Sequence, residues 1–365
     1  MTGKLVLANM RHKPMRSLLS ILLIGVPVTL ILCLVGLSEG LLQDSQNRAR
    51  GVGADIVVRG SNATSAISFS GASMDERLIG FLEKQPHVKL AMGVIGHPID
   101  VPLVMTGIDL ARFNQMSGGF TYSQGGPFRG PDDMIVDKLY AAQKNLHTGD
   151  TVVLVNHSWR IAGIHEGGKL TRIAVPLKTL QDLDSATGKV SQIFVKLDDP
   201  ARANAVAEAL RQVLPGHPIS TMEEWTAMFN VNNIHGLKEF IYVIMGIGIV
   251  IGFAVVCLSM YMAVLQRTRE IGILKSIGGS KAFILRIILI EALALGLGGT
   301  ALGIVMSYGA YWAIATFEPA SIPMIIVYAW WPRACLLTLV GTGLGSLYPG
   351  WSAARHDPIE ALAYE

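Results

Sequence analysis

A compact cluster of charges in this 365-residue chain lies between two long apolar runs, where residues 266–281 read Gln-Arg-Thr-Arg-Glu-Ile-Gly-Ile-Leu-Lys-Ser-Ile-Gly-Gly-Ser-Lys. On a helix, side chains three or four residues apart are neighbours, so Arg267 lies beside Glu270 while Ile271 and Leu274 share an apolar face. Such a short helix can make charge-assisted hydrogen bonds and fill an apolar notch on a partner. The alternative is a basic membrane anchor, which requires arginine and lysine but not this pattern.

Side chains that could support metal or acid–base chemistry are scattered. No two histidines of the central polar stretch are four residues apart, and these are His87, His97, His147, His157, His165, His217 and His235. Gly-Gly-Lys follows His165-Glu166, so the second histidine of a His-Glu-x-x-His zinc motif is missing. We therefore expect surface histidines and no metal site.

The sequence does not indicate a nucleotide-binding loop or a nucleophile elbow either. Leu170 follows Gly168-Lys169 and Val190 follows Gly188-Lys189, whereas a phosphate-binding loop places serine or threonine after its lysine. Gly36-Leu-Ser-Glu-Gly40 has the Gly-x-Ser-x-Gly spacing, but it lies at the end of the first apolar run and not at a strand-to-helix turn, so it does not indicate a nucleophile elbow. We expect a non-catalytic chain that binds no cofactor itself.

The composition indicates a membrane protein with one large polar domain. Apolar residues make up 51% of the chain and charged residues only 16%, against about a quarter in typical soluble domains. Most of the charge lies between residues 42 and 236. The net charge of +3 is small and no long basic run occurs, which excludes nucleic acid as the main partner.

Four apolar runs are long enough to cross a bilayer, which needs about 20 residues. Basic residues precede the first run and crowd the loop after the second, which predicts cytoplasmic termini and an extracytoplasmic polar domain. The N-terminal segment is expected to be an amphipathic helix, with an irregular start as the alternative. The expected layout is an elbow helix at 1–17, transmembrane helices at 18–41, 237–265 and 282–316, the extracytoplasmic domain at 42–236, a cytoplasmic helix at 266–281, an outer loop with a fourth transmembrane helix at 317–350, and a cytoplasmic tail at 351–365.

Glycines four residues apart allow membrane helices to approach closely. Each of the last three runs contains such a pair: Gly248 and Gly252, Gly299 and Gly303, and Gly341 and Gly345. The alternative is that these glycines only make the helices flexible.

Four polar side chains lie in or beside the apolar runs, namely Glu39, Glu239, Tyr242 and Glu291. The first three could line a lateral path for a lipid-like or porphyrin-like substrate, although anchoring at the interface is favoured. Glu291 could be a proton or substrate site, but structural pairing is favoured because an isolated carboxylate in the membrane is costly.

The polar stretch alternates strand and helix patterns, which predicts an α+β domain. Strands are expected at 55–59 and 191–197, and a hairpin at 151–164. Helices are expected at 74–84 and 199–214. Two stalk helices, 38–50 and 225–238, should connect this domain to the membrane. The expected fold class is thus an α-helical membrane protein with four transmembrane helices, one before and three after a large extracytoplasmic α+β domain.

Three segments together resemble the permeases of the MacB/FtsX/LolC-LolE superfamily, the type VII ABC transporters. Residues 266–283 are similar to the family's Arg-Thr-Arg-Glu-Ile-Gly coupling segment, with Gly279 where alanine is common. Residues 348–365 resemble its Pro-x-x-x-Ala-Ala-x-x-x-Pro-x-Glu-Ala-Leu ending, and residues 7–20 its opening.

The resemblance implies a dimer of permeases, with a homodimer expected, bound to two copies of a cytoplasmic ABC ATPase that holds ATP and magnesium. The coupling residues would be Arg267, Thr268, Arg269, Glu270, Ile271, Gly272, Leu274 and Lys275, seated in a groove of the ATPase. MacB itself carries its ATPase at the N-terminus, whereas this sequence opens with the elbow segment, so a separate ATPase chain is expected.

The resemblance also implies a function in a bacterial inner membrane. ATP hydrolysis would move the extracytoplasmic domain, a mechanism called mechanotransmission, to export a hydrophobic or amphipathic substrate. A periplasmic membrane fusion protein and membrane lipid are expected partners. The alternative is a non-transporting FtsX-like transmitter that regulates an extracytoplasmic partner such as a cell-wall hydrolase.

Overall fold

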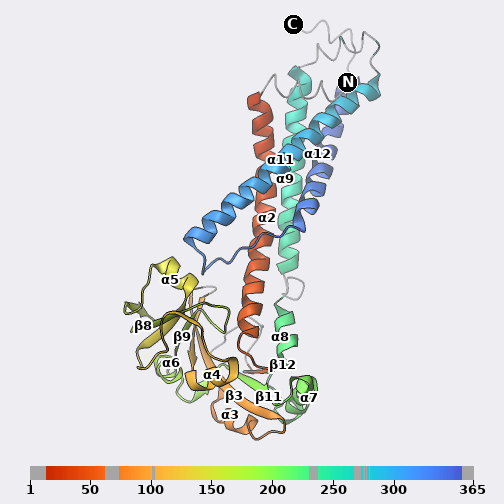
Figure 1. Cartoon of the computed structure of the whole chain (residues 1–365). Helices are drawn as coiled ribbons and strands as arrows, with labels where there is room; N and C mark the ends of the chain where they lie inside the picture. Colours follow the sequence, from red (N-terminus) through yellow and green to blue (C-terminus); the bar gives the residue numbers. More distant parts are fainter. Residues whose placement is uncertain are drawn as a thin grey trace. The chain divides into compact units, whose positions relative to one another are not determined.

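The computed structural model describes residues 14–61, 74–100, 103–229, 237–266, 273, 276, 278 and 280–355. The chain divides into two compact units, which we describe separately (Figure 1). The helical unit comprises Met1–Ser38, Gly236–Ala313 and Met324–Glu365. The sheet unit comprises Glu39–His235 and also Ile314–Pro323, a short segment from late in the chain.

The sheet unit is built on a mixed sheet in the order β12-β1-β11-β3-β4-β9-β6-β8-β5, with β7 paired to β8. The pairs β4–β9 and β6–β8 are parallel and the others are antiparallel. A separate two-stranded sheet pairs β2 with β10. The strands are β1 Ile56–Arg59, β2 Met74–Asp75, β3 Val88–Asp100, β4 Leu103–Ile108, β5 Tyr122–Gly125, β6 Asp133–Asp137, β7 Thr151–Leu154, β8 His157–His165, β9 Ile173–Pro176, β10 Lys189–Val190, β11 Gln192–Leu197 and β12 Ile219–Thr221.

Short helices connect these strands, and side chains cap several of them. Asp109 accepts hydrogen bonds at the start of α4, Asp137 does so at the start of α5, and Thr221 forms a capping box with Glu224 at α8. The helices are α3 Arg77–Leu82, α4 Leu110–Ser117, α5 Lys138–Lys144, α6 Leu177–Leu183, the 3-10 turn η1 Pro200–Arg202, α7 Ala203–Val213 and α8 Met222–Met228.

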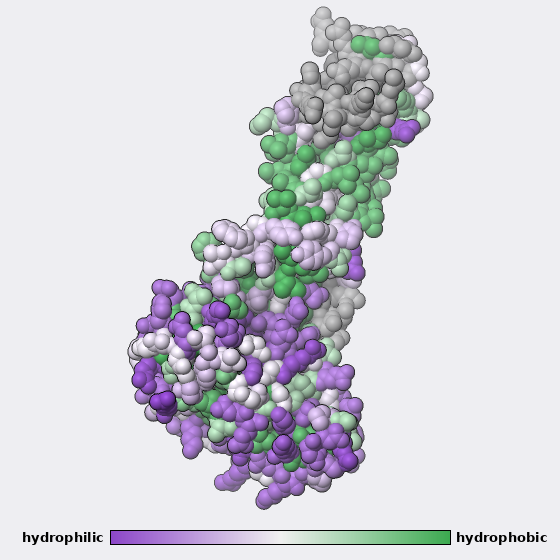
Figure 2. Space-filling model, viewed as in Figure 1, coloured by the Kyte–Doolittle hydropathy of each residue, from purple (hydrophilic) through white to green (hydrophobic). Residues whose placement is uncertain are grey.

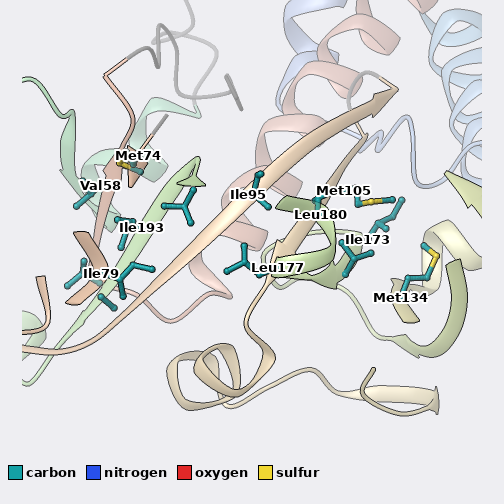
Figure 3. Packing of buried hydrophobic residues seen from close by; sticks show 14 of the residues in the cluster. Val58, Met74, Ile79, Ile95, Met105, Met134, Ile173, Leu177, Leu180 and Ile193 are labelled. Atoms are coloured by element: carbon teal, nitrogen blue, oxygen red, sulfur yellow. The ribbon is translucent and has the colours of Figure 1, made fainter. Parts of the chain in front are cut away.

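The main hydrophobic core lies on one face of the sheet, because alternate residues of a strand point to opposite faces. Ile193 and Val195 of β11 belong to this core, together with side chains of α3, α6 and α7. Figure 3 shows the cluster continuing from Val58 past Ile95 to Ile173. Both halves of the sheet therefore share one core.

The opposite face of the sheet is packed as well. Phe194 lies between Ile193 and Val195 in sequence and so points away from the main core. Its ring lies 5.9 Å from that of Trp225 on α8, which in turn lies 5.4 Å from Phe229. The sheet is thus covered on both faces at β11.

Several strands and helices lie where the local sequence patterns predict them. The hairpin is confirmed as β7 and β8, and its turn places Val155 and Asn156 at φ 53°, as a type I′ turn requires. The strands at 55–59 and 191–197 correspond to β1 and β11, and the helix at 199–214 to η1 and α7. The helix expected at 74–84 begins later, because Met74 and Asp75 pair with β10.

The expectation that the histidines lie at the surface is wrong for His165, which is 1% exposed. Its ring centroid lies 4.5 Å from that of Phe120, and its Nδ1 accepts a hydrogen bond from the backbone N–H of Gly167 at 3.1 Å. Burial, together with the positive charges of Arg172 and Lys169, lowers the pKa of His165 to about 4. The side chain is therefore neutral in the folded protein at neutral pH.

Four long helices lie wholly or mostly in the described part of the helical unit: α2 Pro14–Arg50, α9 Leu237–Gln266, α11 Lys281–Phe317 and α12 Trp330–Arg355. Three of them, α2, α9 and α11, are long and apolar enough to cross a membrane. Figure 2 shows that the surface of these helices is largely hydrophobic and that the surface of the sheet unit is largely hydrophilic. The fourth, α12, is 26 residues long but does not meet the same measure of apolar length.

Helix boundaries differ from the expected ones. The first helix is continuous from Pro14 through Pro27 to Arg50, so the membrane run and the first stalk form one element. The expected elbow at 1–17 lies outside the described residues up to position 13, and positions 14–17 belong to α2. The last helix starts at Trp330 and continues to Arg355, past the expected start of the tail.

Two of the predicted glycines lie where α11 crosses α2. A Cβ added at Gly299 would lie 2.5 Å from Ile24 Cγ2, and one at Gly303 would lie 2.6 Å from Val28 Cγ1. Thr29 of α2 also donates a hydrogen bond to the Gly303 carbonyl at 3.2 Å. A larger residue at either position would force the two helices apart.

Folding stability should fall in mild acid because of His165. The unfolded chain binds a proton on this histidine near pH 6.5 and the folded chain only near pH 4, so the native state loses stability as the pH falls through this window. We expect a contribution of about 3 kcal/mol to the loss between these pH values. His165→Asn, which keeps an acceptor for Gly167, should flatten the profile by that amount.

The free energy of unfolding is measured for the full-length chain in mild detergent by chemical unfolding at pH 4 and 6.5. The matched control is His147→Asn, which removes an exposed histidine of the same unit. An unchanged pH dependence in His165→Asn would contradict the assignment.

Candidate transmission site

The predicted coupling segment lies almost wholly outside the described residues. This applies to Arg267, Thr268, Arg269, Glu270, Ile271, Gly272, Leu274 and Lys275. The site that the structure does describe lies within the sheet unit, around α5, and includes the end of α2 and the segment after α11.

The predicted lateral path is spread over different elements. Glu39 is half-buried on the part of α2 that belongs to the sheet unit. Glu239 and Tyr242 are exposed at the start of α9, and Glu291 is half-buried on α11. Within the helical unit these side chains line no part of the hollow that α2, α9 and α12 enclose.

That hollow accounts for three of the remaining glycines. Gly248, Gly252 and Gly341 line it together with Pro27 and apolar side chains. Gly345 is different, because a Cβ there would lie 2.8 Å from the Phe253 carbonyl oxygen, so α12 and α9 touch at this point. Of the six predicted glycines, Gly299, Gly303 and Gly345 therefore lie at tight helix contacts, and the other three line the hollow.

A buried ion pair fixes the end of α2 in the sheet unit. Arg172, whose side chain is 3% exposed, lies directly before β9 and donates to Asp137 Oδ2 at 2.6 Å. Its other terminal nitrogen donates to Asp44 Oδ2 on α2 at 2.9 Å. Asp44 also pairs with Arg48 one turn later, at 3.0 Å. One guanidinium therefore connects α2 to β6 and β9.

Backbone contacts reinforce this junction. The N–H of Leu170 donates to the Arg48 carbonyl at 2.9 Å. Gly51, directly after α2, lies so close to the Gly168 carbonyl that a side chain at position 51 would clash with it. The end of α2 is thus held against the loop between β8 and β9.

Asp137 has two roles at this junction. Its Oδ1 accepts the backbone N–H of Tyr140 at 2.7 Å and so caps α5, while its Oδ2 pairs with Arg172. Burial raises the pKa of Asp137, and the adjacent Arg172 guanidinium opposes that rise. The position of α5 and the position of α2 therefore depend on the same carboxylate.

The other end of α5 holds the segment that follows α11. The side-chain oxygen of Gln143 accepts the backbone N–H groups of Ala320 and Ser321 at 2.9 and 3.2 Å. Its nitrogen donates to the Ser321 hydroxyl at 2.8 Å and to the Glu318 carboxylate. Ala320 is itself buried in the main core of the sheet unit.

The seven-residue helix α5 thus connects to both long helices, at its start to α2 and near its end to the continuation of α11. Both α2 and α11 are continuous helices that begin in the helical unit and end in the sheet unit. We call Asp44, Asp137, Arg172 and Gln143 the α5 junction.

Possible metal ligands are spread out among the described residues. Across the part of the chain that the structure describes, no three histidine, cysteine, aspartate or glutamate side chains gather as a metal site requires. His87, His97, His147 and His157 each pair with one carboxylate, as His97 does with Asp184 at 2.7 Å. The arrangement is suited to holding elements together.

Sequence patterns did not point to the α5 junction. Arg172 and Asp44 are 128 residues apart, and Gln143 and Ala320 are 177 residues apart. A local signal did exist at Asp137, since an aspartate directly before a helical pattern is a typical N-cap. Its second role with Arg172 has no local signature.

Two family models match consecutive parts of the chain. The MacB-like periplasmic core domain matches residues 17–213, and the FtsX-like permease C-terminal domain matches residues 242–358. The first match alone covers more than half of the chain.

Curated relatives and solved structures are similar to this chain over defined parts. The macrolide export ATP-binding/permease proteins MacB of Shigella sonnei and Escherichia coli K12 are 27% and 26% identical over 318 and 317 residues, which is 78% of this chain and 48% of each relative. The chain therefore spans about half the length of these relatives.

Among solved structures, the periplasmic region of MacB from Actinobacillus actinomycetemcomitans aligns with 51% of this chain and 97% of its own, at 17% identity and a TM-score of 0.37. The extracellular domain of the transporter YknZ from Gram-positive bacteria aligns with 46% and 98%, at 17% identity and a TM-score of 0.34. Because the two family models follow each other along the chain and the core-domain model covers more than half of it, the chain belongs to the MacB/FtsX family of ABC transporter permeases.

Proposed function

We propose that this chain is a mechanotransmitting permease that couples ATP hydrolysis in a separate ATPase chain to motion of its extracytoplasmic sheet unit. The observation that carries the proposal is the α5 junction, which bonds the end of α2 and the segment that directly follows α11. A rigid helix transmits an axial displacement over its whole length. A displacement at the cytoplasmic ends of these helices would therefore move α5 and the sheet.

The proposed topology has four transmembrane helices, α2, α9, α11 and α12, with both termini in the cytoplasm of a bacterial inner membrane. The apolar length of α2, α9 and α11 supports three of these. Support for the fourth comes from α12, which packs on α9 at Gly345. The domain layout follows, with residues 42–236 outside and residues 266–281 inside.

The proposed partners are a second copy of this permease and two copies of a cytoplasmic ABC ATPase that bind ATP and magnesium. Arg267, Arg269 and Glu270, with Ile271 and Leu274 on the apolar side, would seat in the ATPase groove. A periplasmic fusion protein would receive the substrate. This chain supplies no catalytic residue to hydrolysis.

The proposed substrate is a hydrophobic or amphipathic molecule that leaves the membrane or periplasm by this motion. Support comes from the relatives, whose names describe macrolide export. The same motion would also serve a non-transporting transmitter that switches a cell-wall hydrolase. The identity of the third partner separates the two functions.

Native purification of the full-length chain in mild detergent, with mass spectrometry of all co-purifying proteins, tests the proposal. We expect an ABC ATPase to be recovered, and its recovery should drop at least about tenfold in Arg269→Glu and in Glu270→Lys, because each reverses a charge at the docking face. Lys84→Glu, an exposed reversal in the sheet unit, is the matched control. Undiminished ATPase recovery in both coupling variants would refute the docking assignment.

Stability measurements should distinguish the contribution of the buried Arg172–Asp137 pair from that of the Arg172–Asp44 contact to α2. Arg172→Met leaves the buried Asp137 carboxylate unpaired and should cost roughly 3–5 kcal/mol of unfolding free energy. Asp44→Asn removes a partly exposed charge and should cost about 1 kcal/mol. Arg172→Met with Asp137→Asn should recover much of the loss, because asparagine still caps α5 without a charge. Chemical unfolding in detergent gives all values, and equal losses for the two single variants would contradict this division.

Loss of either α5 contact should uncouple motion from hydrolysis. In the ATPase complex reconstituted in nanodiscs, a spin label at exposed Lys189 of each permease copy reports the distance between sheet units, once Cys33, Cys257 and Cys335 are replaced by serine. The ATP-dependent distance change should shrink in Gln143→Ala and in Asp44→Asn, with hydrolysis retained. Gln212→Ala, an exposed glutamine on α7, is the control. A full distance change in both variants would exclude the junction as the route.

A further inference from the structure

An aromatic cluster in the helical unit consists of Tyr308 on α11, Tyr328 just before α12 and Trp331 on α12. The Trp331 ring is 5.9 Å from the Tyr308 ring and 5.0 Å from the Tyr328 ring, both in edge-on geometry. Tryptophan and tyrosine concentrate at the level of lipid headgroups, where one side of the ring is apolar and the other is wet. On the proposed crossing of the membrane by α11 and α12, this cluster marks a membrane surface.

Trp330 and Trp331 are held in place by packing against the helix bundle. Trp330 and Trp331 pack on a small core formed by Val28, Leu32 and Ala334. Each ring is half-buried, so one part contacts this core and the rest is accessible. The rings therefore form a preorganised platform.

Arg333 lies on that platform. Its guanidinium carbon is 5.2 Å from the centre of the Trp330 ring, which is a cation–π contact, and the residue is exposed. A guanidinium stacked in this way keeps its in-plane N–H donors available for a planar or tetrahedral oxyanion. The stacking also reduces the entropy that the side chain loses when it binds an anion.

The described residues of the helical unit offer Arg333 no counter-charge. Their carboxylates are Glu239 and Glu291, and neither forms an ion pair with Arg333 within 4 Å. A fixed cation with free donors at the headgroup level is complementary to the phosphate of a lipid.

We propose that Arg333, Trp330, Trp331 and Tyr328 form a binding site for the headgroup phosphate of an anionic phospholipid. The guanidinium donates to the phosphate oxygens, and the tryptophan and tyrosine rings contact the glycerol region. The site lies at the first turn of α12, ten residues after the segment that Gln143 holds. Lipid bound there would fix the start of α12 at the membrane surface.

Native mass spectrometry of the full-length chain, titrated with phosphatidylglycerol in mild detergent, tests the site. Arg333→Gln should weaken the tightest lipid binding by about fivefold, the effect of roughly one interfacial cationic charge. Trp330→Leu should weaken it as well, because the guanidinium loses its support. Arg333→Lys should retain part of the affinity, since it keeps the charge but loses the planar fork.

Arg129→Gln, which removes an exposed arginine of the sheet unit, is the matched control and should bind as the unaltered chain does. Phosphatidylcholine should bind more weakly than phosphatidylglycerol to the unaltered chain. Equal lipid binding by Arg333→Gln and the unaltered chain would overturn the proposal, as would full competition by inorganic phosphate at the lipid's concentration. ATPase recovery is measured separately, so failure of the lipid site and failure of the proposed function give different results.

Discussion

The buried pair between Arg172 and Asp137 is the constraint on which the sheet unit and its connections depend. A guanidinium that is 3% exposed requires full pairing, and Asp137 and Asp44 supply it from two different elements. The same Asp137 caps α5, so the helix that holds the segment after α11 starts at the residue that pairs with Arg172, and Arg172 in turn holds α2. The end of α2 and the segment after α11 are therefore both bonded at α5, which lies beside the sheet.

The helical unit solves a different problem, because helices in lipid gain little from burying apolar surface and associate through close packing. Gly299 and Gly303 let α11 approach Ile24 and Val28 of α2 closely, and these are the two helices that continue into the sheet unit. Tight packing between the two helices would make them move together. Gly248, Gly252 and Gly341 instead line a hollow. Glycine therefore allows close helix packing at some positions and leaves space between helices at others.

Local patterns predicted the parts of the fold that local physics decides. The hairpin of β7 and β8 follows from alternating residues around a polar turn, and α7 follows from Pro200 and an apolar stripe. His165 shows the limit of such reasoning, because nothing in its neighbours along the chain distinguishes a buried histidine from an exposed one. The start of α3 was misplaced for a similar reason, since Met74 pairs with a strand more than a hundred residues later.

Composition and hydropathy were sufficient to determine a membrane protein with one polar α+β domain, and the charged segment at 266–281 with the C-terminal pattern was sufficient to indicate the family. These properties depend on overall composition or on residues close together in the chain, so they can be predicted from the sequence without the fold. The α5 junction is different, because Arg172 meets both Asp44 and Asp137 only after ten strands order themselves in one sheet. Contacts between residues 128 or 177 positions apart depend on that whole topology, and only the tertiary structure decided them.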